Sequence, residues 1–292
     1  GHSKSNYTLL TVIMSVNQTL LKQFLRDYPF QPATGFWRAV EIDQVISCHF
    51  PEGFGLDLGC GDGKLTKIIL EGVGHRELVG VDIDPKETEQ AAQLKIYQRI
   101  HTIPANKIPE PDETFDFVFS NSVLEHIDNL EDVLRETARL LKPGGVFLFT
   151  VPGDKFHQCL RGSLLPWVSR QAYLNEIDSR CAHLRYWSVE DWRQHLLENR
   201  LEIEQVTEYL NQSEVQRWET LSRFTAGVLY SLFGKKKHPI EIQRTLGIRK
   251  VKTKLPTFLA SLFTHLFTLN LKTFKSQRGE PKGCLMIQAK KC

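Results

Sequence analysis

The sequence predicts an α/β fold in which helices cover both faces of a mostly parallel, seven-stranded sheet. Two observations carry this prediction. Short apolar runs alternate with segments of helical periodicity from residue 54 onward, and a glycine cluster separates the first run from the helix after it. Strands that alternate with helices connect as right-handed βαβ units, which place the strands parallel in one sheet.

Six apolar runs have the length and composition of buried strands. They occupy residues 54–58, 78–81, 115–119, 146–151, 201–206 and 284–289. Helical patterns separate the first four runs at 64–70, 86–100 and 130–141. Another helical pattern, over 36–50, predicts a helix packed on the core before the first strand. Ser188, followed three residues later by Asp191, predicts the start of a further helix.

Composition excludes several classes of protein. The 292 residues carry a net charge of only +3, so no global basic field draws the chain to nucleic acid. No apolar run approaches the roughly 20 residues that span a bilayer. The six cysteines contain no C-x-x-C pair, so neither a zinc site nor a disulfide framework is indicated and no metal is expected. Free thiols favour a cytoplasmic location.

A glycine-rich turn after the first strand predicts a nucleotide-like ligand. Residues 59–63 read Gly-Cys-Gly-Asp-Gly and follow Asp57 in the strand. Glycine permits the tight backbone angles of such a turn and lets a ligand approach the main chain. Asp82 ends the second strand about 20 residues further on, where a carboxylate can bind ribose hydroxyls. Asp84 is expected to cap the next helix instead.

Two pyrophosphate-binding motifs fit the turn poorly. A dinucleotide fingerprint requires a third glycine where the chain has Lys64. A phosphate-binding P-loop requires glycine at Leu58 and a hydroxyl residue at Leu65. An NAD(P)-dependent oxidoreductase with a degenerate glycine turn stays open as an alternative function.

The motifs between about residues 54 and 152 together resemble those of the class I S-adenosylmethionine-dependent methyltransferases that act on small molecules. The resemblance rests on the glycine turn, Val-Asp at 81–82, the strand at 115–120, Leu-Glu-His at 124–126 and Leu-Leu-Lys-Pro-Gly-Gly at 140–145. It implies a Rossmann-like fold, S-adenosylmethionine as the cofactor, and methyl transfer to a small acceptor. We interpret residues 142–145 as a helix-ending turn with a structural role.

The resemblance also implies roles for individual residues. Asp57 and the backbone of 59–63 would hold the methionine moiety, Asp82 the ribose, and the residues after the fourth strand would lie against the cofactor. Many relatives have an acid on the adenine at the position of Pro104, so here adenine binding is expected from Ala105 or Asn106. The predicted cofactor residues are Asp57, Gly59, Cys60, Gly61, Gly63, Asp82, Ile83, Ala105, Asn106, Asn121 and Ser122.

Methyl transfer depends mainly on alignment, and a base is needed only if the acceptor must lose a proton. The candidate bases are His126, His157 and His183, because neutral imidazole accepts protons near pH 7. The alternative for His126 is a structural hydrogen bond to backbone at the start of a helix.

The acceptor is expected to be small, and hydrophobic, lipid-like or a secondary metabolite. Aromatic residues between 157 and 187 are expected to line its pocket at the carboxyl edge of the sheet. The alternative is that they pack in the core, which is the preferred interpretation for Trp187 and Trp192. The chain has Asn-Ser-Val-Leu at 121–124, which lacks the Pro-Pro-aromatic motif of nucleic-acid amino-methyltransferases, and it lacks the Pro-Cys pair of cytosine methylation. No nucleic-acid partner is therefore expected.

Four parts of the chain are expected. They are an N-terminal segment with helices over 1–50, a cofactor-binding core over 51–210 with an acceptor-side loop at 152–187, a helical insertion over 211–282, and the last strand over 283–292. The insertion carries two apolar stripes at helical spacing with a basic stretch between them, and we expect it to cap the acceptor pocket. Contact with an anionic membrane through 235–274, in a noncatalytic cofactor-binding or peripheral membrane protein, is the alternative.

Overall fold

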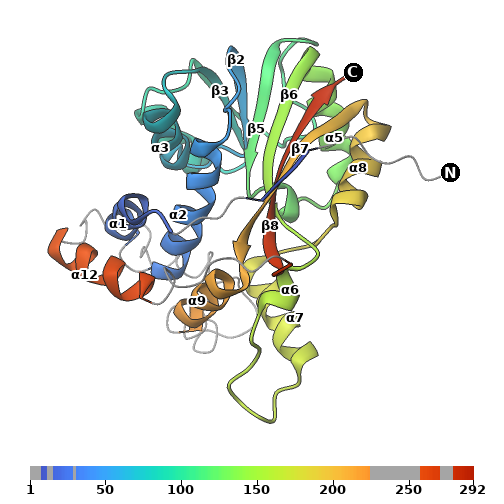
Figure 1. The fold of residues 1–292 in the computed structure, drawn as a ribbon. Coiled ribbons are helices and arrows are strands. Elements are labelled where there is room, and N and C mark those ends of the chain that lie inside the picture. The colour runs from blue at the N-terminus through green and yellow to red at the C-terminus, as the bar shows by residue number, and fades with distance from the viewer. Residues whose placement is uncertain (1–7, 12–15, 29–30, 224–256, 270–278) are drawn as a thin grey trace.

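The computed structural model describes residues 8–11, 16–28, 31–223, 257–269 and 279–292 (Figure 1). Its centre is one eight-stranded sheet in the order β1-β7-β8-β6-β5-β2-β3-β4. Strand β8 runs antiparallel to β6 and β7, and the other neighbours are parallel. The predicted Rossmann-like, mostly parallel seven-stranded sheet is confirmed, and the short strand β1 adds an eighth strand at its edge. The strands are β1 (Thr8–Thr11), β2 (Phe54–Leu58), β3 (Glu77–Asp82), β4 (Arg99–Thr102), β5 (Phe115–Asn121), β6 (Leu141–Pro152), β7 (Leu201–Asn211) and β8 (Lys282–Lys291).

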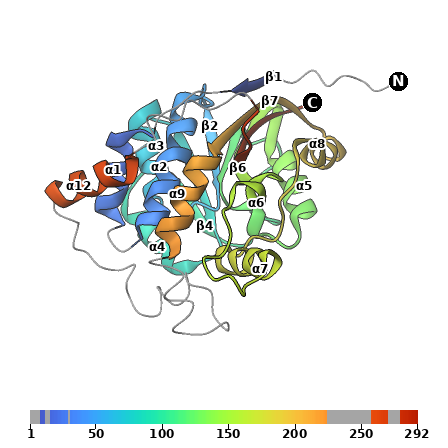
Figure 2. The same ribbon diagram turned by 60° about the horizontal axis from the view of Figure 1, so that its bottom comes forward.

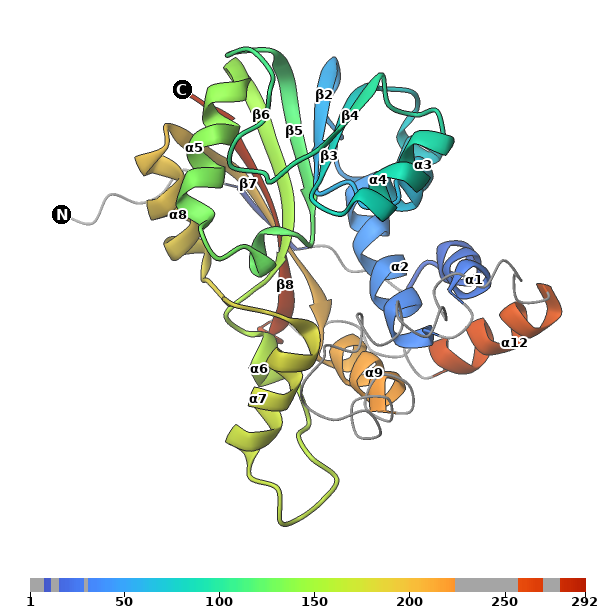
Figure 3. The same cartoon turned by 180° about the vertical axis from the view of Figure 1, so that it is seen from behind.

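Helices cover both faces of the sheet, as Figure 3 shows. Phe117 and Phe119 of β5 belong to the core on the side of α2 (Pro32–Ser47) and α3 (Lys64–Val73). Val118 lies between them in sequence and belongs to the opposite core, beneath α5 (Leu130–Leu140) and α8 (Val189–Glu198). Alternate side chains of a strand point to opposite faces, so a central strand must be apolar on both. This requirement explains the continuous apolar runs in the sequence.

Local signals place two helix ends where they were predicted. The Ser188 hydroxyl accepts the Asp191 N–H at 3.2 Å, and the Asp191 carboxylate accepts the Ser188 N–H at 2.8 Å, which is a capping box. Asp84 accepts the Lys86 N–H at 2.9 Å and caps α4 (Pro85–Gln93), as expected.

Two predicted boundaries are wrong. The helix predicted over 86–100 ends at Gln93, because Arg99–Thr102 forms β4 at the edge of the sheet. This strand is exposed or half-buried along its length, so it lacks the apolar pattern of the central strands. The segment 142–145, interpreted as a helix-ending turn, lies inside β6, where an irregularity between Phe115 and Phe117 interrupts the pairing with β5.

The N-terminal region and the described parts of the insertion form one group of helices beside the sheet (Figure 2). Helix α9 (Gln212–Ser222) packs on α2 and on α6 (Phe156–Cys159), while α12 (Thr257–Thr268) packs on α1 (Gln18–Asp27). Helix α7 (Arg170–Cys181) follows α6. The basic stretch and most of the first predicted stripe lie outside the described residues. No helix in the described part of the chain is both long and apolar enough to cross a membrane.

Candidate cofactor and acceptor site

The glycine turn lies at the end of β2, between the ends of β3 and β5. Gly59, Gly61 and Gly63 have φ angles of +78°, +53° and +76°, which other residues rarely adopt. A Cβ on Gly59 would lie 2.4 Å from a methyl carbon of Val123, whereas a Cβ on Gly61 would meet only the Glu87 carboxylate, at 3.6 Å. Gly59 is therefore required by packing, and Gly61 by its backbone angle alone.

Asp82 fixes this turn to the end of β3. Its two carboxylate oxygens accept the N–H groups of Gly61 and Asp84, each at 2.9 Å. The N–H groups of Gly59 and Cys60 donate to the Val81 carbonyl at 2.8 and 2.9 Å. Because these donors are used within the protein, a ligand would meet the turn through carbonyl oxygens and close backbone contact.

Asp57 is a buried carboxylate on the face of β2 that carries α3. Its Oδ2 accepts the hydroxyls of Thr66, at 2.5 Å, and of Tyr97, at 2.6 Å. Only 2% of the residue is exposed, and burial raises the pKa of this carboxyl to about 6. An amino group placed beside it would favour the charged form.

The remaining predicted cofactor residues of this region follow the ends of β3 and β4. Strands β3 and β4 pair with Asp82 opposite Thr102, so the segments after both strands emerge together. Ile83 is 68% exposed despite its apolar side chain, and Asn106 is exposed in the loop after β4. The structure thus brings the predicted residues of four strands to one edge of the sheet, while their contacts with a ligand remain a prediction.

Glu41 of α2 organises the turn after β5, and sequence reasoning missed it. Its carboxylate accepts the hydroxyls of Ser122 and Tyr209 at 2.5 and 3.0 Å and the Asn121 amide at 2.9 Å. Burial opposes its charge, but these bonds and the ion pair with Arg38 outweigh burial and hold the pKa of Glu41 below its usual value. The sequence did contain one signal for Glu41, since an acidic residue within the apolar helical pattern of 36–50 is expected to have a polar partner.

This network uses the side chains of Asn121 and Ser122. The Asn121 carbonyl oxygen also accepts the Thr150 hydroxyl at 3.0 Å, and Ser122 has a φ of +51° that is unusual for serine. The Ser122 N–H donates to the carbonyl and hydroxyl oxygens of Thr150. The predicted contacts of both residues with a cofactor would therefore come from their backbone atoms.

The three predicted histidines lie in one polar cluster near the end of β5. His126, in the short helix η1 (Leu124–His126), donates its Nδ1–H to the Ala182 carbonyl at 2.7 Å. His183 donates Nδ1–H to the Tyr186 hydroxyl at 2.9 Å, and Tyr186 donates in turn to Asp178. The rings of His126 and His183 have centroids 5.6 Å apart. The backbone bond predicted for His126 is thus present.

His157 belongs to the same cluster through Asp178. Its Nε2–H donates to the Asp178 carboxylate at 2.8 Å. Burial lowers the pKa of His183 to about 3, so that ring is neutral at pH 7. The Glu125 carboxyl, beside His126, has its pKa raised to about 8 by burial.

An aromatic cluster borders these polar groups. The Phe156 ring stacks on Tyr186 with centroids 5.5 Å apart and meets Trp37 and Trp218 edge-on at 5.6 and 5.8 Å. These rings come from α6, the segment after α7, α2 and α9. This part of the core, beside the predicted acceptor side, is therefore a junction of segments far apart in the sequence.

Comparisons with known proteins match part of this chain to methyltransferase domains. The family model of the methyltransferase domain matches residues 56–149. A sterol 4-C-methyltransferase of Caenorhabditis elegans is 34% identical over 115 residues, 37% of this chain and 32% of the relative. A trans-aconitate 2-methyltransferase of an Azoarcus strain is 29% identical over 40% of this chain and 47% of the relative. The matched region thus spans less than half of either relative.

Solved structures show the same fold over most of the chain. An S-adenosylmethionine-dependent methyltransferase of Thermotoga maritima has a TM-score of 0.52 at 18% identity and covers 94% of this chain and 99% of its own. The methyltransferase in a complex with the Haloferax volcanii Trm112 activator has a TM-score of 0.51 at 14% identity, over 94% of this chain and 97% of its own.

Together the fold, the glycine turn and the family match define the class of protein. Residues 56–149 match a methyltransferase domain, and the sheet that carries them has the Rossmann-like strand order of the class I S-adenosylmethionine-dependent methyltransferase fold. This match indicates S-adenosylmethionine as the cofactor.

Proposed function

We propose that the protein transfers a methyl group from S-adenosylmethionine to a small acceptor. The observation that carries the proposal is the edge formed by Asp57, the glycine turn and Asp82. A buried carboxylate suits the amino group of the methionine moiety, and Asp82 offers carboxylate oxygens at the position expected for ribose. The exposed Ile83 beside it offers an apolar surface to an adenine ring. Bound S-adenosylmethionine would supply the activated methyl group.

Calorimetric titration of the full chain tests the cofactor half of this proposal. We expect S-adenosylmethionine and S-adenosylhomocysteine to bind and NADH not to bind. NADH is not expected to bind, because its pyrophosphate would have to approach a turn that carries Lys64 in place of the third glycine. The oxidoreductase alternative predicts the reverse result. Binding of NADH alone would refute the methyltransferase proposal.

We further propose that the acceptor is small and at least partly hydrophobic. Phe156, Trp37 and Trp218 are buried in the hydrophobic core, whereas Tyr186 is half-buried beside His157 and His183. The Tyr186 ring supports an acceptor with an apolar part, and the adjacent histidines support one with a polar reacting atom. The matched relatives carry names for sterol and trans-aconitate methylation, so relatives of this domain act on both apolar and acidic molecules. A metabolite panel, read by release of S-adenosylhomocysteine, would identify the acceptor.

Of the three histidines, His157 has the arrangement of a general base. Its Nε2–H is held by Asp178, a geometry that fixes the ring and directs Nδ1 toward proton acceptance. His126 and His183 instead face Glu125. We propose His157 as the proton acceptor for an acceptor molecule that must lose a proton.

The insertion over 211–282 is proposed to cap the acceptor side, with the basic stretch outside the described residues. Trp218 of α9 supports this role, because it already contributes a ring to the aromatic cluster. A cytoplasmic location is proposed from the six cysteines, all of which are free thiols.

A further inference from the structure

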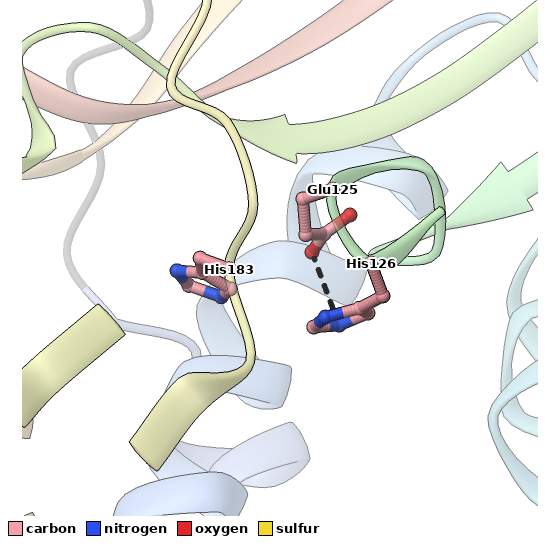
Figure 4. A group of neighbouring side chains, drawn as sticks. All are labelled: Glu125, His126 and His183. Carbon is pink, nitrogen blue, oxygen red and sulfur yellow. Dashed lines mark ion pairs between the residues drawn. The ribbon is translucent and has the colours of Figure 1, made fainter. Parts of the chain in front are cut away.

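Glu125, His126 and His183 converge from two segments more than fifty residues apart (Figure 4). One side-chain atom of each residue, a carboxylate oxygen or an imidazole nitrogen, lies within 4.8 Å of the others. The Nε2 atom of His126 is 3.7 Å from Oε1 of Glu125. Two imidazoles and one carboxylate at such spacing need only small side-chain movements to share one ion.

The backbone of the two segments is fixed before any ligand is bound. The Leu184 N–H donates to the Glu125 carbonyl at 2.9 Å, and the Arg185 guanidinium donates to the carbonyls of Leu124 and Ile127. Ala182 accepts the Nδ1–H of His126. The two segments are therefore held together by hydrogen bonds to their main-chain carbonyls.

Hydrogen bonds from the Nδ1 atoms fix the orientation of both histidine rings. The Ala182 carbonyl accepts from His126, and the Tyr186 hydroxyl, which itself donates to Asp178, accepts from His183. An imidazole that donates one N–H to a carbonyl or to a carboxylate-linked hydroxyl presents the other nitrogen as a ligand. This outer arrangement is characteristic of histidines that bind metals.

An independent observation at Glu125 points to a cation. The residue is 1% exposed, yet its Oε2 has no hydrogen-bond partner among the described residues. Burial of a polar oxygen without a donor is unfavourable, by about 1–3 kcal/mol. A bound cation would satisfy this oxygen.

We propose that Glu125, His126 and His183 bind one divalent first-row transition metal ion, such as Zn²⁺, Co²⁺, Fe²⁺ or Mn²⁺. Mixed imidazole and carboxylate ligands favour these ions over Mg²⁺ and Ca²⁺, which prefer oxygen. Three protein ligands leave coordination positions open. If the proposed methyltransferase function holds, an oxygen or nitrogen of the acceptor would occupy one of them, beside the turn after β5.

Cobalt provides the test, because its visible absorption reports its ligands. The chelator-treated full chain is titrated with Co²⁺, and we expect saturation at one ion per chain. A cysteine ligand would add an intense sulfur charge-transfer band, which we expect to be absent. Glu125→Gln, His126→Ala and His183→Ala should each weaken binding at least tenfold. Zinc calorimetry on the same proteins provides a second readout.

Glu131→Gln is the matched control. Glu131 bonds His195, which stacks on Trp187, so these two members of the second group of potential ligands are already joined by a hydrogen bond. Its loss should leave Co²⁺ binding unchanged. Thermal unfolding should show a metal-dependent rise in Tm for the wild type and for Glu131→Gln only.

The proposal is overturned if the wild type shows no saturable binding, or if the three ligand variants bind Co²⁺ as tightly as the control. Glu125→Gln keeps the shape of the side chain and so tests the charge even where an alanine variant unfolds. Titration with S-adenosylhomocysteine in parallel separates the two proposals. Normal cofactor binding without metal binding would refute only the metal site, and the converse would refute only the methyltransferase function.

Discussion

Asp57 combines complete burial with a role at the predicted methionine end of the cofactor. With its pKa raised to about 6, the carboxyl is protonated in the free protein at acid pH. An unfolded aspartate has a pKa of about 3.9, so the folded state loses stability as the pH rises from about 4 to about 6. A cationic amino group reverses this preference because it stabilises the carboxylate.

We therefore predict that the affinity for S-adenosylhomocysteine is constant above about pH 7 and falls below about pH 6. The fall should approach tenfold per pH unit, because binding must then displace one proton. Calorimetry over this range measures it. Asp57→Asn should bind weakly with no such slope, while Asp84→Asn, which keeps the cap of α4, should behave like the wild type. If Asp57→Asn showed the same decrease of affinity with falling pH, the titrating group would be a residue other than Asp57.

Asp82 has both a structural and a predicted ligand role, and these have separable effects. Asp82→Ala should weaken S-adenosylhomocysteine binding by about 10- to 150-fold, the equivalent of about 1.5–3 kcal/mol for a lost charged hydrogen bond. The chain should remain folded, since the Gly59 and Cys60 N–H groups still bond Val81. Calorimetry and urea unfolding measure the two effects. Unchanged affinity in the folded variant would contradict the predicted contact between Asp82 and the cofactor.

His157 is expected to affect turnover and not cofactor binding. His157→Gln should lower the rate constant of methyl transfer by about 10²- to 10⁴-fold if the acceptor must lose a proton. S-adenosylhomocysteine affinity, measured alongside, should be unchanged. Because the Asp178 carboxylate holds the ring, Asp178→Asn should lower the rate less. Full turnover in His157→Gln would show that its bond to Asp178 is structural.

Among the helices and strands, those whose position depends on local residue chemistry could be predicted from the sequence. The strand, glycine turn and helix from Phe54 to Val73 form as predicted, because burial on two faces and positive φ angles leave few other residues allowed. Strand β4 could not be predicted from an apolar pattern, because it lies at the edge of the sheet and is exposed or half-buried. Its position is set by pairing with β3. The hydrogen bonds of Glu41 and the position of His183 beside Glu125 could not be predicted either, because they join helices and loops that meet only after folding.

Helix α2 illustrates such a tertiary dependence. Through Glu41 it connects the end of β5, at Asn121 and Ser122, with Tyr209 of β7. We predict that Glu41→Ala lowers the free energy of unfolding by about 3–5 kcal/mol, because it leaves Arg38 without its buried partner. Tyr209→Phe removes one hydrogen bond and should cost about 1 kcal/mol. Urea unfolding compares them, and equal losses would contradict a central role for Glu41.

At the scale of the whole molecule, the cofactor edge and the acceptor side are built from different parts of the chain. The cofactor edge comes from β2 to β5 and follows the family motifs. The predicted acceptor side adds α2, α6, α9 and the segment after α7, for which the sequence offers aromatic residues but no spacing rule. This division explains why the cofactor could be predicted from the sequence and the acceptor could not.

The insertion should therefore be separable from cofactor binding. Helix α9 must be kept, since Glu219 accepts the N–H groups of Arg161 and Gly162 and the Tyr173 hydroxyl, at 2.9, 3.1 and 2.6 Å. We predict that replacing residues 224–278 with a flexible Gly/Ser linker leaves S-adenosylhomocysteine affinity largely unchanged and abolishes methyl transfer to the acceptor found by screening.

A second variant tests whether α12 acts through its buried face or through its exposed apolar side chains. Phe258, Leu262 and Leu266 of α12 are 71%, 50% and 43% exposed, whereas Ala260 and Thr264 are buried. Replacing the three exposed residues with serine keeps the buried face of α12 and should preserve transfer if this helix acts through the buried face. Loss of transfer in this variant would instead assign the acceptor to the exposed face. Normal transfer by the folded, shortened chain would show that the insertion does not cap the acceptor side.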